Sequence, residues 1–450
     1  MRDKDAPPGT VFRSVQSNLL TPWRKQTAEE LGPEVEGASG ASFRIAPGRE
    51  VLDFGSQYVY CNLGHNNALL KAKLREALDA TTIAPDFRLD VREEAARKLA
   101  EVAPGDLDRV FFSTSGTEAV EAALKMAKSL TGKPIVFSQY QSYHGSTMGS
   151  VSVSPGRRAW EYEPGLPGVI CARPCDPYHC PKAPAGGHCS DCGEHCARDL
   201  EYLILANGPH RVAAVLIEPI LGSNGIIIPG DGYLQTIREI CDRYGILLIF
   251  DEVMTGFGRT GRWFASEHWS VVPDIMALAK GLTSGYVPGG ATVVRSSVAK
   301  AWDDKALTHS HTYANHPLTC AAVSASVDLY RQEDLPGRAA RLGEFVIDKA
   351  RELKERHRSI GDVRGMGLFV GMELVRDRHE KTPLSRDLAT QSALMERVYS
   401  AALERGVYLY VMLNKNVLSL TPPLCVTEEE IDFAMSVVDE ILVIADEMAS

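Results

Sequence analysis

Short apolar runs alternate with stretches of helical periodicity through the middle of the chain. The runs 110–112, 134–137, 213–217 and 246–250 are almost entirely apolar, which is typical of strands that are covered on both faces. The intervening stretches, such as 117–130, carry apolar residues three or four positions apart, as amphipathic helices do. This alternation predicts an α/β fold with a mostly parallel central sheet and helices on both sides.

The two ends of the chain have a different pattern. Residues 51–64 predict one or two short strands that place Tyr58 and Tyr60 on one face. Residues 363–374 predict a single strand with a bend marked by glycine. Thr427 with Glu430 three residues later is a capping box, which predicts the start of a final helix.

These patterns divide the chain into three parts. We expect an N-terminal arm and part of a small domain over 1–70, and a large domain over 71–330. Residues 331–450 are expected to form the rest of the small α+β domain.

Polar residues follow the predicted strands of the large domain. Ser115, Gly116 and Thr117 follow the first strand, and Thr117 begins a helix. A strand, a small-residue turn and a helix N-terminus together form an anion site, because free backbone N–H groups point at the turn. Tyr143 with His144, Glu218, and Asp251 follow the later strands, where ligands of open α/β sheets bind.

Lys280 lies in the otherwise apolar stretch 275–281, 29 residues after Asp251 (280 − 251). A charged amine is costly to bury among apolar groups unless it is paired or neutralised. A neutral lysine is a nucleophile that forms imines with carbonyl compounds. Lys280 is therefore a candidate catalytic residue that needs a carbonyl partner.

Composition narrows the function class. The 450-residue chain carries a net charge of −10, which disfavours nucleic-acid and anionic-membrane partners. It lacks a run of about 18 apolar residues that could span a bilayer, and its N-terminus lacks the apolar core of a signal peptide. We expect a soluble cytoplasmic enzyme that acts on small molecules.

Six of the ten cysteines fall within residues 171–196, together with three histidines. These ligand types would suit a tetrahedral zinc site. The alternative is a surface insertion of reduced thiols that binds no metal, and we adopt it as the expectation. The residues concerned are Cys171, Cys175, Cys180, Cys189, Cys192 and Cys196, with His179, His188 and His195.

Seven motifs occur in order between residues 113 and 374, namely STSGTEA, SYHG, IEPI, IFDEVMTGFGRTG, PDIMALAKG, HTYANHP and VRGMGLFVGMEL. Together they resemble the class III aminotransferases, which are pyridoxal-phosphate (PLP) enzymes. The resemblance covers nearly the whole chain. It implies the aspartate-aminotransferase-like fold, PLP fold type I, in which both termini contribute to the smaller domain.

The resemblance implies roles for the polar residues beyond the strands. By similarity, Lys280 forms the internal aldimine with PLP and then moves the substrate proton. Asp251 would face the pyridine nitrogen and keep it protonated. Val253 and Tyr143 would pack on opposite faces of the ring. Glu218 matches a position close to the cofactor, where a structural hydrogen-bonding role is an open alternative.

The phosphate would bind at Ser115, Gly116 and Thr117. By similarity, Thr312 would reach it from the neighbouring subunit, so the resemblance implies a homodimer with shared active sites, or a higher oligomer built from it. His144 is either a cofactor contact or a packed histidine.

The substrate half departs from the family pattern. One branch uses an arginine that pairs with a glutamate to bind the 2-oxo acid, but Ser419 and Ser223 occupy those positions. Met412 occupies the position of a mobile arginine in another branch. Carboxylate binding would then fall to Lys415 or Arg88, and Tyr58 and Tyr60 are further candidates for the pocket.

The resemblance is nearest to ω-amino acid, taurine and amine:pyruvate aminotransferases. We expect transfer of an amino group from an amine or a taurine- or β-alanine-like ω-amino acid to a 2-oxo acid, with pyruvate as the expected acceptor. Lyases, mutases and decarboxylases use the same fold and lysine and stay open as alternatives. A cofactor-binding regulator would need a DNA-binding module, for which the acidic chain offers no room.

Overall fold

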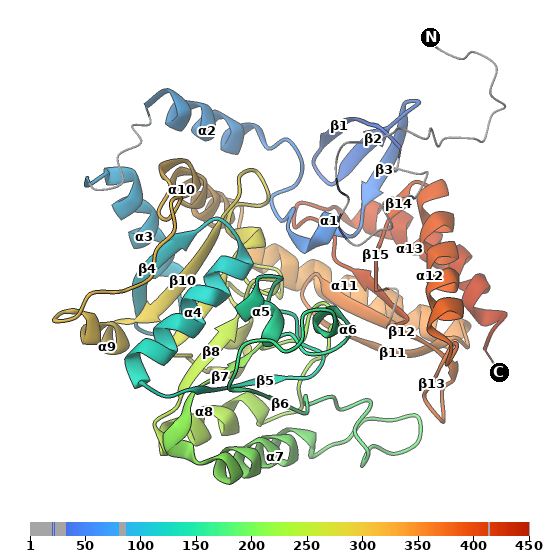
Figure 1. Ribbon diagram of the computed structural model, residues 1–450. Coiled ribbons are helices and arrows are strands. Elements are labelled where there is room, and N and C mark those ends of the chain that lie inside the picture. The colour runs from blue at the N-terminus through green and yellow to red at the C-terminus, as the bar shows by residue number, and fades with distance from the viewer. Residues whose placement is uncertain (1–19, 21, 23–32, 81–86, 413–414, 450) are drawn as a thin grey trace.

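The computed structural model describes residues 20, 22, 33–80, 87–412 and 415–449. Most of the predicted N-terminal arm, up to residue 32, lies outside these ranges. The described residues form three sheets with helices packed around them (Figure 1). None of the helices in these ranges combines the length and the apolar character that crossing a membrane requires.

The largest sheet has seven strands in the order β4-β10-β9-β8-β7-β5-β6. β10 runs antiparallel to both of its neighbours, and the other pairs are parallel. The prediction of a mostly parallel central sheet is confirmed. Its strands are β4 (Leu107–Ser113), β5 (Ile135–Gln139), β6 (Val169–Ala172), β7 (Val212–Ile217), β8 (Leu247–Asp251), β9 (Ile275–Leu278) and β10 (Gly290–Arg295).

Successive side chains of the central strands enter two different cores. In β7, Leu216 packs with α4 (Gly116–Thr131), whereas Ile217 packs with α7 (Cys192–Asn207) and α8 (Tyr233–Tyr244). In β8, Ile249 packs in the core that contains α4, and Phe250 packs in the core that contains α7 and α8. Because side chains of a strand alternate between its faces, helices must cover both sides of the sheet. Figure 1 shows α4 on one side and α7 with α8 on the other.

A third group of helices packs at the β4 edge. α10 (Pro317–Gln332) contacts both α2 (Ala68–Ala80) and α3 (Asp90–Val102), and α3 packs against β4. The short helices are α1 (Ser56–Val59), α5 (Met148–Ser152), α6 (Arg157–Trp160) and α9 (Ser296–Ala299), with 3-10 turns η1 (Pro209–Arg211), η2 (Ala265–Trp269), η3 (Lys280–Leu282) and η4 (Lys300–Trp302).

The C-terminal part of the chain forms a second, antiparallel sheet. It comprises β11 (Ile360–Met366), β12 (Phe369–Asp377), β16 (Val417–Leu420) and β15 (Tyr410–Met412), with β13 (Thr382–Pro383) beside β12. α11 (Leu335–Arg356) packs on β11 and β12, and α12 (Leu388–Glu404) packs on α13 (Glu428–Asp446). Thr427 and Glu430 form the predicted capping box at the start of α13.

The third sheet joins the two ends of the chain. β1 (Val35–Ser39), β2 (Ser42–Ile45) and β3 (Arg49–Asp53) are antiparallel neighbours, and β14 (Val407–Tyr408) pairs in parallel with β3. Residues from both ends of the chain therefore build the part of the molecule beside the large sheet (Figure 1).

Two local predictions were wrong in part. Residues 51–64 were expected to form one or two short strands with Tyr58 and Tyr60 on one face. β3 supplies one strand, which ends at Asp53, but the part with the tyrosines is not a strand, because Ser56 and Val59 have φ angles of 48° and 60° and the chain coils into α1. Residues 363–374 were expected to form one bent strand. They lie in two antiparallel strands, β11 and β12, because Gly367 has a φ of 55° and reverses the chain between them.

Arg259 connects the large sheet to the rest of the molecule. Its guanidinium group, which has no exposed surface, donates to Leu368 O (3.0 Å) and Pro422 O (2.6 Å) through one nitrogen. The other nitrogen donates to Ser56 Oγ (3.1 Å) and Asn62 Oδ1 (2.7 Å). One side chain after β8 thus satisfies acceptors from three other segments of the chain.

Replacing Arg259 should destabilise the protein strongly. Arg259→Met leaves four buried acceptors without their donor, and each unsatisfied buried group costs about 1–3 kcal/mol. We expect the thermal unfolding midpoint, followed by circular dichroism, to fall by several degrees. Arg262→Met, which changes an exposed arginine of the same loop, is the matched control. Equal midpoints for the two variants would contradict this role.

Candidate active site

A cavity of about 520 Å³ lies beyond the carboxyl ends of β8 and β9. Eight residues singled out from the sequence line it: Tyr60, Gly116, Thr117, Tyr143, His144, Asp251, Val253 and Lys280. The other lining residues are Gly145, Ser146, Ala279, Thr283, Gly285, Val287, Pro288 and Gly289. The sequence pattern did not single these out, although the Gly- and Ser-rich stretch after Lys280 was a signal for part of them.

Asp251 is the last residue of β8 and is 4% exposed. Its Oδ2 lies 2.7 Å from His144 Nδ1, and its Oδ1 accepts the Val253 backbone N–H at 2.9 Å. Because a carboxylate only accepts hydrogen bonds, Nδ1 is the protonated nitrogen of His144 toward Asp251. His144 Nε2 is buried without a hydrogen-bond partner in the described residues. His144 therefore orients Asp251 at the wall of the cavity.

Lys280 follows β9 and lines the same cavity. Its φ of 49° lies in the left-handed region, which is strained for a bulky residue and is kept only where the surroundings enforce it. Burial lowers the pKa of its amine, the carboxylates of Asp251 and Glu218 act in the opposite direction, and the charge of Arg158 lowers it further. A larger fraction of the amine is thus neutral than for an exposed lysine.

Glu218 lies behind the cavity wall. Its Oε1 accepts the Tyr143 backbone N–H at 2.9 Å, and its Oε2 accepts the Gly222 backbone N–H at 2.8 Å. Burial raises the pKa of Glu218 to about 7, with the charge of Asp251 adding to this and His144 opposing it. Glu218 positions Tyr143 through its backbone and does not itself line the cavity.

The N-terminus of α4 forms another part of the wall. The Ser115 side chain accepts the Glu118 backbone N–H and caps the helix at 3.3 Å. Thr117 Oγ1 accepts the backbone N–H groups of Ser146 and Thr147 at 3.2 Å each. A side chain at Gly116 would lie 3.1 Å from Val253 Cγ1, so glycine keeps this corner open. The helix N-terminus favours an anion here.

The remaining predicted residues lie outside the cavity lining of this chain. Arg88 and Thr312 are exposed, and Tyr58 is 62% exposed with its ring edge-on to Tyr410 at 5.9 Å. Met412 in β15 and Ser419 in β16 are buried, and burial lowers the pKa of Lys415. Ser223 is partly buried and contacts Met254. Their predicted roles stay predictions.

Arg158 in α6 is a residue that the sequence reasoning missed. Its guanidinium carbon lies 4.5 Å from the ring centroid of Tyr143, a cation–π distance, and its charge acts on both Lys280 and Lys415. The tandem arginines 157–158 were a signal in the sequence. Only the structure shows that the second one, which is partly buried, stacks on a wall residue of the cavity.

Comparison with known proteins places the chain among enzymes of one family. The description of the class-III aminotransferases matches residues 26–442. An ω-aminotransferase of Caulobacter vibrioides is 34% identical over 434 residues, covering 91% of this chain and 93% of that protein. A taurine–pyruvate aminotransferase of Bilophila wadsworthia is 36% identical over 363 residues, covering 77% of each.

A solved structure shows the same fold. The taurine:2-oxoglutarate aminotransferase from Bifidobacterium kashiwanohense, in complex with PLP and glutamate, has a TM-score of 0.90 and 31% identity to this chain. The superposition covers 95% of this chain and 96% of that chain.

The cavity suits PLP in its chemical groups. It places a helix N-terminus, a buried carboxylate and an amine of lowered pKa around one space, beside the unpartnered Nε2 of His144. PLP brings a phosphate, a basic ring nitrogen and an aldehyde, which are the respective complements of these groups. With its match to the family over most of its length, this chain belongs to the class III aminotransferases, which are PLP-dependent enzymes of fold type I.

Proposed function

We propose that this enzyme transfers an amino group from an amine or a taurine- or β-alanine-like ω-amino acid to pyruvate. The observation that carries the proposal is the cavity in which Lys280 and Asp251 lie beside the N-terminus of α4. The names of the similar proteins support the finer statement, since they include an ω-aminotransferase and a taurine–pyruvate aminotransferase. We also propose a homodimer, with the exposed Thr312 completing the site of the neighbouring subunit.

PLP, when bound, supplies an electrophilic aldehyde and a ring that takes up electron density from the substrate. Asp251 would hold the ring nitrogen, with His144 fixing the orientation of its carboxylate. Val253 and Tyr143 would pack on the two ring faces. Backbone N–H groups at Gly116 and Thr117 would hold the phosphate at the start of α4.

Lys280 would perform the proton transfer of each half-reaction. A neutral Nζ accepts a proton from the substrate carbon and returns it, which is general acid–base catalysis. The lowered pKa of Lys280 keeps more of this amine neutral, and Asp251 and Glu218 limit the shift. The same Nζ would bind the cofactor carbonyl between turnovers.

Arg158 is our proposed recognition residue for the acidic end of the donor. Its stacking on Tyr143 places a guanidinium group beside a ring of the cavity wall. Guanidinium groups bind carboxylates and sulfonates with paired N–H donors. This would supply an anion contact in a chain that has Ser419 and Met412 where related branches use arginine.

Transfer is tested by supplying taurine or β-alanine with pyruvate and measuring alanine. We expect amine-dependent alanine formation that stops in Lys280→Ala, because Lys280 is the only lysine among the described residues that line the cavity. Lys300→Ala, which removes an exposed lysine, should retain wild-type activity.

Two outcomes would contradict the proposal. Consumption of the donor without any 2-oxo acid would indicate elimination in place of transfer. A strong preference for 2-oxoglutarate over pyruvate would show that the proposed acceptor is wrong.

Arg158→Met should separate acidic donors from neutral ones. A charge-assisted hydrogen bond contributes about 1.5–3 kcal/mol, so we expect kcat/KM for taurine and β-alanine to fall roughly 10- to 100-fold. The value for benzylamine, which has no acidic group, should change little. Arg157→Met, at the exposed neighbour, is the matched control. An equal loss for benzylamine would indicate that Arg158 supports Tyr143 and binds no donor anion.

A further inference from the structure

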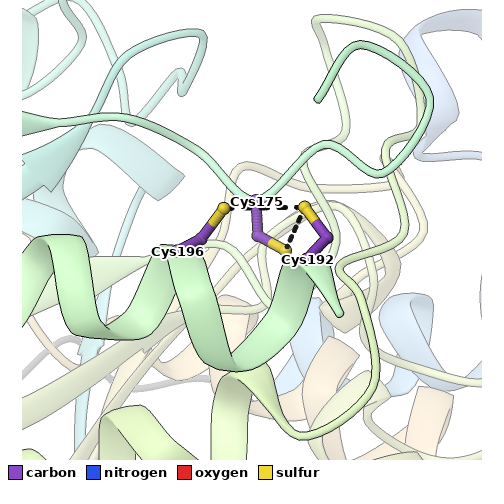
Figure 2. Close-up of side chains that lie close together, drawn as sticks. All are labelled: Cys175, Cys192 and Cys196. Carbon is purple, nitrogen blue, oxygen red and sulfur yellow. Dashed lines mark hydrogen bonds between the residues drawn. The ribbon is translucent and has the colours of Figure 1, made fainter. Parts of the chain in front are cut away.

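Five cysteines gather in the segment after β6 and in the first turns of α7, and none of them lines the candidate active site. We call Cys175, Cys180, Cys189, Cys192 and Cys196 the five-thiol cluster; all five are buried. Their sulfur atoms form two groups of three, 175/192/196 and 180/189/192, each within 4.8 Å. Figure 2 shows the sulfurs of the first group directed toward one another. Cys192 belongs to both groups.

The spacing of the sulfurs indicates what could lie between them. Cys192 Sγ is 3.5 Å from Cys175 Sγ and 3.5 Å from Cys196 Sγ. A disulfide would need about 2.05 Å. Four sulfurs around one zinc ion, each about 2.3 Å from it, are roughly 3.8 Å apart. The two observed separations are thiol–thiol hydrogen-bond distances, and they also lie close to the spacing of sulfurs around one zinc ion.

One backbone donor and one carboxylate contact the sulfurs. The Gly230 N–H donates to Cys175 Sγ at 3.2 Å, and the Cys189 thiol donates to Asp191 Oδ1 at 3.1 Å. Cys192 is the first residue of α7, where the helix dipole favours a negative charge. The Gly230 N–H and the helix N-terminus favour thiolates at Cys175 and Cys192, and the thiolate is the metal-binding form of cysteine.

The nearby histidines are engaged elsewhere. His179 Nε2 lies 2.5 Å from Glu373 Oε1, and His188 Nε2 lies 3.2 Å from Asp362 Oδ1. His195 faces Asp199, with 3.9 Å between Nε2 and the carboxylate. The two groups of three therefore consist of sulfur alone, which suits a soft tetrahedral ion such as zinc.

We propose that the five-thiol cluster binds one Zn²⁺ ion per chain through four thiolates. Cys192 is one of the four, because both groups share it; one group supplies three thiols within 4.8 Å, and the fourth comes from the other group. Four S–H protons leave to solvent as four Zn–S bonds form, and no atom is oxidised or reduced.

The ion would fix one side of the large domain. Cys175 Sγ accepts a hydrogen bond from the backbone N–H of Gly230, three residues before Tyr233. Tyr233 Oη in turn accepts a hydrogen bond from Gln139 Nε2 at 2.7 Å. Gln139 ends β5, four residues before Tyr143. In the same segment, His179 contacts Glu373 of β12, and His188 contacts Asp362 of β11. The zinc site would thus be structural and would support both the cavity wall and the packing of the C-terminal sheet.

Metal analysis tests the proposal directly. We expect the PLP-loaded protein, dialysed against a weak chelator, to retain about one zinc per chain by mass spectrometry of its metals. Cys192→Ser should lose the ion. Cys171→Ser, which changes a cysteine of the same segment outside both groups of three, is the matched control and should keep it.

A measurement on the wild-type protein covers the case in which Cys192→Ser does not fold. X-ray absorption at the zinc edge should show four sulfur neighbours at about 2.3 Å. A thiol-specific mercurial should release the ion in step with the modification of cysteines. A zinc-free wild type, iron in place of zinc, nitrogen or oxygen neighbours, or retention of zinc by Cys192→Ser would overturn the proposal.

Discussion

The structure of the site depends on one buried carboxylate at the end of a buried strand. Asp251 is fixed by His144 Nδ1 on one oxygen and by the Val253 N–H on the other. A charged group at this depth is costly unless its oxygens are paired. Both partners also line the cavity, so the contacts that stabilise Asp251 shape the space in front of it.

The neighbouring acid organises the opposite side of β8. Glu252 has no exposed surface, and it accepts the backbone N–H groups of Ala265 and Ser266 at 2.9 and 2.8 Å. Glu252 is the first residue after β8, so the acid that ends the strand serves the cavity and the next one closes the loop 252–266. Arg259 in that loop then binds three other segments. The cavity and the contacts of Arg259 with Ser56, Leu368 and Pro422 thus begin at the same strand end.

The sequence predicted best where burial is continuous. β7, which ends before Glu218, is buried along its whole length, and β8, which ends at Asp251, is buried except at Leu247, so both apolar runs match strands that are covered on both faces. The strand prediction for residues 51–64 was wrong beyond Asp53, because Ser56 and Val59 have positive φ angles. Tertiary packing sets these angles, and an alternating apolar pattern does not indicate them. The boundaries at 70 and 330 stay predictions.

The sequence predicted least about residues whose role depends on a contact with a distant segment of the chain. Arg158 had no motif of its own, and only its stacking on Tyr143 connects it to the cavity. In the segment 171–196 the sequence supplied the thiols and histidines but not their separation. The expectation that this segment binds no metal gave way to a zinc proposal because five sulfurs converge while His179 and His188 bind carboxylates. Convergence of this kind depends on side-chain directions that spacing alone does not fix.

The central proposal is that Asp251 would hold the ring nitrogen of the bound cofactor in its protonated form. Nitrogen NMR of the enzyme loaded with PLP labelled at the ring nitrogen measures this protonation directly. We expect the chemical shift of a protonated pyridine nitrogen in the wild type and of an unprotonated one in Asp251→Asn, which keeps the size of the side chain and removes its charge. The same protonation state in both proteins would contradict the assignment of Asp251.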